Sequence, residues 1–176
     1  EEPAGARSVP LPKGAWIVPG FIDAHSHLGS ALEADEPTES LTPQVKAVEG
    51  FATRHPDVRA ALGSGVTRAA IAPGDGNVIG GRIGVVLLNG ERYDRALLLD
   101  AAALKGSIGE EALRRDREPT SRTGALKMIR DFLRSRPAGL PLFLHASTEG
   151  EIRSALLLQE ETGVKIVLVH AREAAK

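Results

Sequence analysis

The sequence predicts an α/β protein with parallel strands, and the C-terminal half supplies the observations behind this prediction. Residues 140–144 and 165–169 are short apolar runs that are typical of buried strands. Between them, Thr148 and Glu151 form a Thr-x-x-Glu capping box, which predicts a helix that ends before Gly163. A strand–helix–strand unit of this kind is expected to place its strands parallel, with a right-handed crossover.

The rest of the chain is expected to add strands and helices around this unit. Residues 1–16 are rich in Pro, Gly and Ala and indicate an irregular lead-in, or the remnant of a small β domain, before one main domain over 17–176. The other expected elements are a buried strand over 16–22 interrupted at Pro19-Gly20, a short helix over 43–48, a helix from Pro56 to Gly63, strands over 66–72 and 78–88, a hairpin turn at Asn89-Gly90, a strand or helix over 96–104, and a helix over 121–134.

Composition narrows the class of protein and of site. The 176 residues carry a net charge of -1 without a basic block, which argues against a nucleic-acid partner. No apolar run approaches the roughly 20 residues that cross a bilayer, so no membrane partner is expected. The chain has no cysteine, which excludes disulfides and thiolate ligands and suits a cytoplasmic protein. A bound metal would therefore need His, carboxylate or modified Lys ligands.

His25 and His27 follow an apolar segment in the run DAHSH. In a strand, residues two apart point to the same face, so both imidazoles are expected to project together. Imidazole binds Zn, Fe, Ni and similar ions. A His-x-His pair alone is a weak signal, because solvated or structural pairs are common.

His145 and His170 each end a buried strand, in the runs LPLFLH and KIVLVH. Carboxyl ends of parallel strands are where α/β proteins place their sites. One such histidine could be a core residue bonded to backbone, but two of them together with the His25–His27 pair favour a metal site. His55 stands before Pro56 at a helix start and is interpreted as a surface residue.

The run IVPGFIDAHSH over 17–27 closely resembles the first-strand signature of the amidohydrolase superfamily, in its imidazolonepropionase-related branch. The similarity extends from about Gly14 to the last residue. Its sequence blocks indicate the family when they are taken together, although no single block is decisive. The further similar blocks are 41–47, 65–67, 73–81, 104–110 and 119–124.

The resemblance implies a partial (β/α)8 TIM-like barrel with the metal at the carboxyl ends of its strands. It places the first-strand ligand pair on His25 and His27, and the fifth- and sixth-strand ligands on His145 and His170. Lys105 matches the carboxylated lysine that bridges two metals in binuclear members. A lysine in an Ala/Leu segment is often a surface group instead, and Glu110 is the weaker carboxylate alternative.

The same resemblance implies a cofactor and a reaction class. One or two divalent ions are expected, with Zn favoured and Fe, Mn or Ni also compatible with histidine ligands. Such an ion lowers the pKa of bound water to about 7 and polarises a carbonyl. The implied activity is hydrolysis of an amide or cyclic amide or amidine C–N bond in a small-molecule substrate.

The chain departs from the family in its length. The family uses an Asp after the eighth strand as ligand and proton carrier, whereas this sequence ends six residues after His170. A complete barrel takes about 250 residues, so the last two βα units are expected to be missing. A fragment of a longer enzyme, a homo-oligomer that covers open sheet edges, and a non-catalytic binding or assembly subunit all remain compatible with the sequence.

Two further segments are interpreted as lacking a ligand role. The glycine-rich run 74–81 has no Gly-Lys-Ser/Thr ending, so we expect a turn-rich loop near the site rather than a phosphate loop. Arg114, Arg115 and Arg117 are interpreted as a solvated face.

Overall fold

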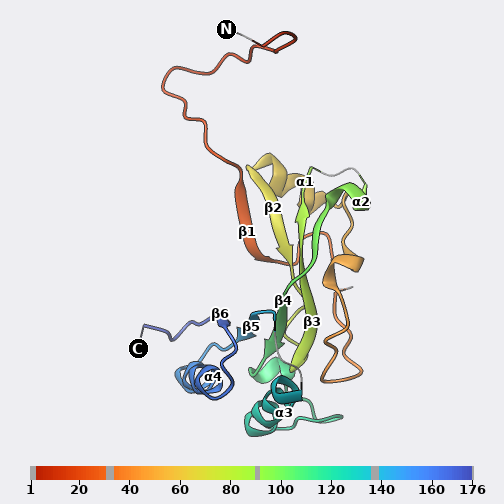
Figure 1. The fold of residues 1–176 in the computed structure, drawn as a ribbon, viewed down its shortest axis with the longest axis vertical. Helices are drawn as coiled ribbons and strands as arrows, with labels where there is room; N and C mark the ends of the chain where they lie inside the picture. Colours follow the sequence, from red (N-terminus) through yellow and green to blue (C-terminus); the bar gives the residue numbers. More distant parts are fainter. Residues whose placement is uncertain (1–2, 31–33, 90–91, 136–138, 176) are drawn as a thin grey trace.

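A computed structural model describes residues 3–30, 34–89, 92–135 and 139–175 (Figure 1). None of the described helices is long and apolar enough to span a membrane. In chain order the elements are β1 (Phe21–Ser26), η1 (Ala47–Gly50), α1 (Pro56–Gly63), β2 (Val66–Ile71), β3 (Ile79–Leu87), α2 (Tyr93–Ala96), β4 (Leu97–Ser107), η2 (Glu110–Ala112), α3 (Arg122–Ser135), β5 (Leu142–His145), α4 (Glu149–Thr162) and β6 (Ile166–Val169).

The described strands form one six-stranded sheet in the order β1-β2-β3-β4-β5-β6. The pairs β1–β2, β4–β5 and β5–β6 are parallel, whereas β3 runs antiparallel to both of its neighbours. All strands except β3 therefore run in the same direction. Their carboxyl ends lie at the same side of the sheet, and this side carries the candidate site.

The predicted strand–helix–strand unit is confirmed as β5–α4–β6. The Thr148 side chain accepts a hydrogen bond from the backbone N–H of Glu151, and the Glu151 carboxylate accepts one from the backbone N–H of Thr148, which completes the capping box. Gly163 ends α4 with a φ of 70°, a left-handed conformation that glycine adopts without a Cβ clash. The sequence prediction of this helix is therefore right at both ends.

The two largest hydrophobic clusters among the described residues pack against the sheet. Helices α3 and α4 lie at one end of the long β3–β4 ribbon, and α1 and α2 lie at the other (Figure 1). The larger cluster lies under α3 and α4, with Ile129, Leu144 and Leu158 fully or almost fully buried. The smaller one includes Val58 of α1 and Ile71 at the end of β2. Because β3 and β4 reach both clusters, they hold the two ends of the molecule in one sheet.

The N-terminal strand departs from its prediction. The strand begins at Phe21 rather than at residue 16, and Trp16 and Ile17 are 91% and 83% exposed. Residues 3–20 form no helix or strand, because the segment finds no partner strand among the described residues and Pro19 lacks a backbone N–H. The division into a lead-in of 1–16 and a main domain of 17–176 stays a prediction.

Other differences concern local structure. The predicted helix over 43–48 is only the short turn η1, and the ambiguous segment 96–104 is mostly strand β4. The hairpin turn at Asn89-Gly90 falls partly outside the described residues, although β3 and β4 pair antiparallel as a hairpin requires.

Candidate metal centre

His25 and His27 lie at the carboxyl end of β1, at one edge of the sheet. Their ring centroids are 5.2 Å apart in an edge-on arrangement, as the alternation of side chains in a strand predicts. The Nδ1 atom of His27 lies 2.9 Å from the carbonyl oxygen of Ala72, which can only accept a hydrogen bond. A neutral His27 ring that donates to this carbonyl carries its proton on Nδ1 and keeps the Nε2 lone pair available for a ligand.

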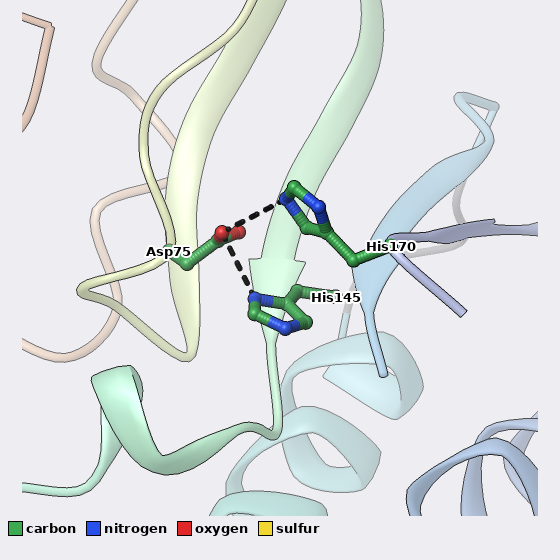
Figure 2. A group of neighbouring side chains, drawn as sticks. All are labelled: Asp75, His145 and His170. Carbon is green, nitrogen blue, oxygen red and sulfur yellow. Dashed lines mark ion pairs between the residues drawn. The ribbon is translucent and has the colours of Figure 1, made fainter. Parts of the chain in front are cut away.

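His145 ends β5, and His170 directly follows β6, so neighbouring strands bring the two rings together (Figure 2). Their centroids are 4.7 Å apart, and the His170 ring also lies 6.1 Å from that of His25. His145 is 4% exposed, whereas the side chain of His170 is 45% exposed. The four histidines singled out in the sequence thus form one continuous group of rings.

Asp75 supplies a carboxylate to this group, and the sequence analysis did not single it out (Figure 2). Its Oδ2 atom lies 2.9 Å from Nδ1 of His145 and 3.4 Å from Nε2 of His170. One ligand atom from each of these three residues lies within 4.8 Å of the others, a spacing that could hold a metal ion. Asp75 lies in the glycine-rich turn that follows β2 rather than at the strand end itself, so the strand-end argument that identified the histidines did not reach it.

Lys105, the predicted bridging residue, is fully buried in β4 and not a surface group. Its Nζ atom donates hydrogen bonds to Oδ1 of Asp75 and to the carbonyl oxygen of Gly106. Burial lowers the pKa of Lys105 below its ordinary value, and the Asp75 carboxylate opposes part of this effect. Glu110, the weaker alternative, is exposed at the start of η2.

The charges around Asp75 keep its carboxylate ionised. Burial by itself would raise the pKa of Asp75, but the ammonium of Lys105 and the rings of His145 and His170 outweigh burial, so its pKa is lowered. An ionised carboxylate beside imidazole nitrogens is a donor set that suits a transition-metal dication.

Two buried ring nitrogens of this group lack a hydrogen-bond partner among the described residues: Nε2 of His25 and Nδ1 of His145. The His145 atom is close to Asp75 but lacks hydrogen-bond geometry, while its Nε2 atom bonds the Ser147 hydroxyl at 2.9 Å. Unpaired buried nitrogens are costly, and a bound cation would satisfy both. The residues present therefore fit a metal ion.

The pKa of His25 is lowered to about 4, first by burial and then by the positive charge of Lys105. Between about pH 6.5 and pH 4, His25 is therefore protonated in the unfolded state but largely unprotonated in the folded state. Stability falls as the pH falls through this window, by on the order of 1 kcal/mol after solvent screening.

We expect His25→Gln to remove this contribution. Urea unfolding of metal-free protein at pH 7 and pH 4.5 should show a smaller loss of stability on acidification for the variant than for the wild type. Equal losses in the two proteins would contradict the assignment of the lowered pKa to His25.

A cavity of about 250 Å³ opens beside His145. Its wall includes Ser147, the exposed carboxylate of Glu111, and Arg172. Oε2 of Glu111 lies 3.9 Å from Nδ1 of His145, so the cavity reaches the ring that faces Asp75. A small polar molecule in this cavity would contact the histidine group directly.

The remaining predictions about individual residues have mixed outcomes. His55 lies outside the site, where its Nδ1 atom pairs with Asp57 at 2.5 Å at the start of α1. Arg114 pairs with Asp116, in agreement with a solvated role. Arg117 does not fit the predicted solvated face, because its guanidinium reaches the loop that carries Asp75.

Comparison with known proteins gives two amidohydrolases. The chain is 28% identical over 135 residues to the amidohydrolase tasK of Hapsidospora irregularis, an alignment covering 64% of this chain and 14% of that protein. It superposes on the crystal structure of an amidohydrolase from Thermotoga maritima MSB8 with a TM-score of 0.80 and 27% identity, covering 96% of this chain and 57% of that one. No family model matches the sequence.

These comparisons agree with the fold class predicted from the sequence, a partial barrel of the metal-dependent hydrolase type. The structural match includes nearly all of this chain. The chain spans little more than half the length of the solved relative and a small part of the curated one. The chain is thus similar in sequence and fold to amidohydrolases, and its six described strands form an α/β half-barrel.

Proposed function

We propose that the chain forms the metal-binding part of a hydrolase that cleaves C–N bonds of amides, cyclic amides or amidines. The observation that carries this proposal is the convergence of one carboxylate and four imidazoles from the carboxyl ends of four strands. Similarity to amidohydrolases supports the same reaction class. The substrate is a small molecule that enters through the cavity beside His145.

The ligands in this proposal are His25, His27, His145 and His170, joined by Asp75. The ionised carboxylate of Asp75 offsets part of the charge of a dication, and the histidines supply neutral nitrogen donors. Histidine and carboxylate donors favour Zn, the most common ion with such ligands, and also accommodate Fe, Mn or Ni. In this proposal Lys105, which bonds the Asp75 carboxylate, is the residue that would be carboxylated if the centre held a second ion.

In this centre a divalent ion would supply Lewis acidity and lower the pKa of a water molecule toward about 7. The chain's own residues prepare the site. The carbonyl of Ala72 fixes the tautomer of His27, and the Ser147 hydroxyl orients the ring of His145. Lys105 holds the carboxylate of Asp75 toward the two imidazoles before any ion binds.

The blocks that resemble the imidazolonepropionase-related branch favour a cyclic substrate with a ring carbonyl. Asp75 belongs to one of these blocks, and Lys105 to another. A branch assignment of this kind predicts that hydrolysis opens the ring and gives a product with a new carboxylate. A panel of five- and six-membered cyclic amides and amidines is the appropriate first screen.

The proposal is tested by elemental analysis of the purified chain after reloading with Zn and dialysis. We expect about one or two ions per chain, and loss of the ion in the His25→Ala/His145→Ala double variant. A metal content near zero in the wild-type chain would exclude the proposed centre. Stoichiometric metal without hydrolysis of any cyclic amide or amidine would instead favour a non-catalytic binding subunit.

A further inference from the structure

We propose that Arg117 is a positioning residue that holds the loop bearing Asp75 in the geometry needed for metal binding. This inference rests on the proposed function, because it takes Asp75 as a ligand. It concerns a residue far from β2 in the sequence, on the segment between η2 and α3. Arg117 contacts none of the histidines in the described hydrogen bonds, so its effect on the centre would be indirect.

The guanidinium of Arg117 binds three groups around the loop. Its Nη2 atom donates to the carbonyl oxygen of Gly76 and to Oδ1 of Asn77, each at 2.8 Å. Its Nη1 atom donates to the hydroxyl of Ser40, which in turn donates to the carbonyl oxygen of Glu118. Arg117 thus links Gly76, the residue after Asp75, to the bend at Ser40, and through the Ser40 hydroxyl to Glu118 of its own segment.

Asn77 extends this network on its other side. The side-chain amide of Asn77 donates to the carbonyl oxygen of Glu36 at 2.7 Å and to Oγ1 of Thr42 at 3.0 Å. Asn77 and Thr42 are 3% and 1% exposed, so the bond between these two side chains is made away from solvent. A buried amide such as that of Asn77 is held in place when both its oxygen and its nitrogen are paired, and Arg117 supplies the partner for Oδ1 of Asn77.

The loop needs such restraints because Asp75 stands between two glycines. Glycine loses more conformational freedom on ordering than any other residue, so Gly74 and Gly76 would let the carboxylate move. The backbone N–H of Gly74 donates to Oδ1 of Asp35 at 2.5 Å, which fixes one side of Asp75. The bond from Arg117 to Gly76 fixes the other side.

Arginine is suited to this task for a geometric reason. One terminal nitrogen spans a backbone carbonyl and a side-chain carbonyl while the other reaches a hydroxyl, a fork that the point-like ammonium of lysine cannot reproduce. The Nε atom of Arg117 is buried without a hydrogen-bond partner among the described residues. That cost is offset by the three groups that the terminal nitrogens bind.

Arg114 provides a matched control. It is an arginine of the same segment, but its guanidinium pairs with Asp116 at 3.2 Å, and 40% and 70% of the two side chains are exposed. An exposed pair of this kind contributes little to stability. Arg114→Met and Arg117→Met therefore remove the same chemical group, one from the surface and one from the loop network.

The experiment compares the wild type with Arg117→Met, Arg117→Lys and Arg114→Met. Affinity for Co²⁺ is measured by titration, the visible absorption spectrum of the bound Co²⁺ is recorded, and hydrogen–deuterium exchange is followed over 74–79. We expect Arg117→Met to lose about 10- to 100-fold in Co²⁺ affinity, to change the spectrum, and to exchange faster over 74–79. Arg117→Lys should resemble Arg117→Met, and Arg114→Met the wild type.

The outcomes separate this inference from the proposed function. Wild-type affinity and spectrum in Arg117→Met, with metal still bound, would overturn the positioning role and leave the metal centre standing. Full recovery in Arg117→Lys would also overturn it, because charge alone would then explain the effect. If the wild type binds no Co²⁺, both the proposed function and this inference fail, whatever the exchange over 74–79.

Discussion

Replacing Asp75 with alanine should lower the free energy of unfolding of the metal-free protein by about 3 kcal/mol. The variant leaves the ammonium of Lys105, which is fully buried, without its carboxylate partner. Removal of one member of a buried ion pair is costly because the other charge loses both its partner and its water. Urea unfolding in the presence of a chelator measures the loss.

The companion variant is Lys105→Met in the Asp75→Ala background. Methionine fills a similar volume without a charge, so the double variant should recover much of the lost stability while remaining unable to bind metal with full affinity. Stability effects that simply add in the double variant would show that the two side chains are not energetically coupled. The recovery therefore distinguishes a buried ion pair from two independent packing contributions.

Substituting His145 or His170 with alanine should lower Zn affinity by at least about 100-fold. Four-ligand zinc sites contribute about 10–16 kcal/mol of binding free energy, which corresponds to about 3 kcal/mol for each ligand. Competition with a fluorescent zinc chelator measures the change. The effect should be present for both residues, because both rings face the Asp75 carboxylate (Figure 2).

His55→Ala is the control for these two variants. His55 pairs with Asp57 at the start of α1 and lies outside the ring group, so its removal should leave Zn affinity within about twofold of the wild type. A large loss in His55→Ala would indicate a different ligand set. Unchanged affinity in both His145→Ala and His170→Ala would exclude the proposed centre.

Local signals in the sequence predict much of the C-terminal fold. The capping box at Thr148 and the glycine at 163 define α4 without reference to the rest of the chain, because a helix end depends on a few nearby hydrogen bonds. The strand over 16–22 fails for the opposite reason. Its apolar residues indicate burial, but burial requires a partner surface, and Trp16 and Ile17 have none among the described residues.

The site could be predicted as far as the strand ends could be recognised. His145 and His170 follow strands with clear apolar runs, so their convergence follows from parallel topology. Asp75 was not identified because it lies in a glycine-rich turn and a lone aspartate in such a turn is common. Arg117 could not be found at all, since its partners are backbone and side-chain oxygens about 40 or more residues away. The metal-ligand assignments stay predictions.

His25 and His170 come from β1 and β6, the outermost strands of the sheet, yet their ring centroids lie only 6.1 Å apart. The sheet is therefore curled so far that its two margins approach one another at this end. An ion held by both imidazoles would connect the two edge strands. Its binding free energy would then add to the free energy of unfolding of the whole sheet. At a free metal concentration of 100 times the dissociation constant, metal binding would raise the free energy of unfolding by about 2.7 kcal/mol.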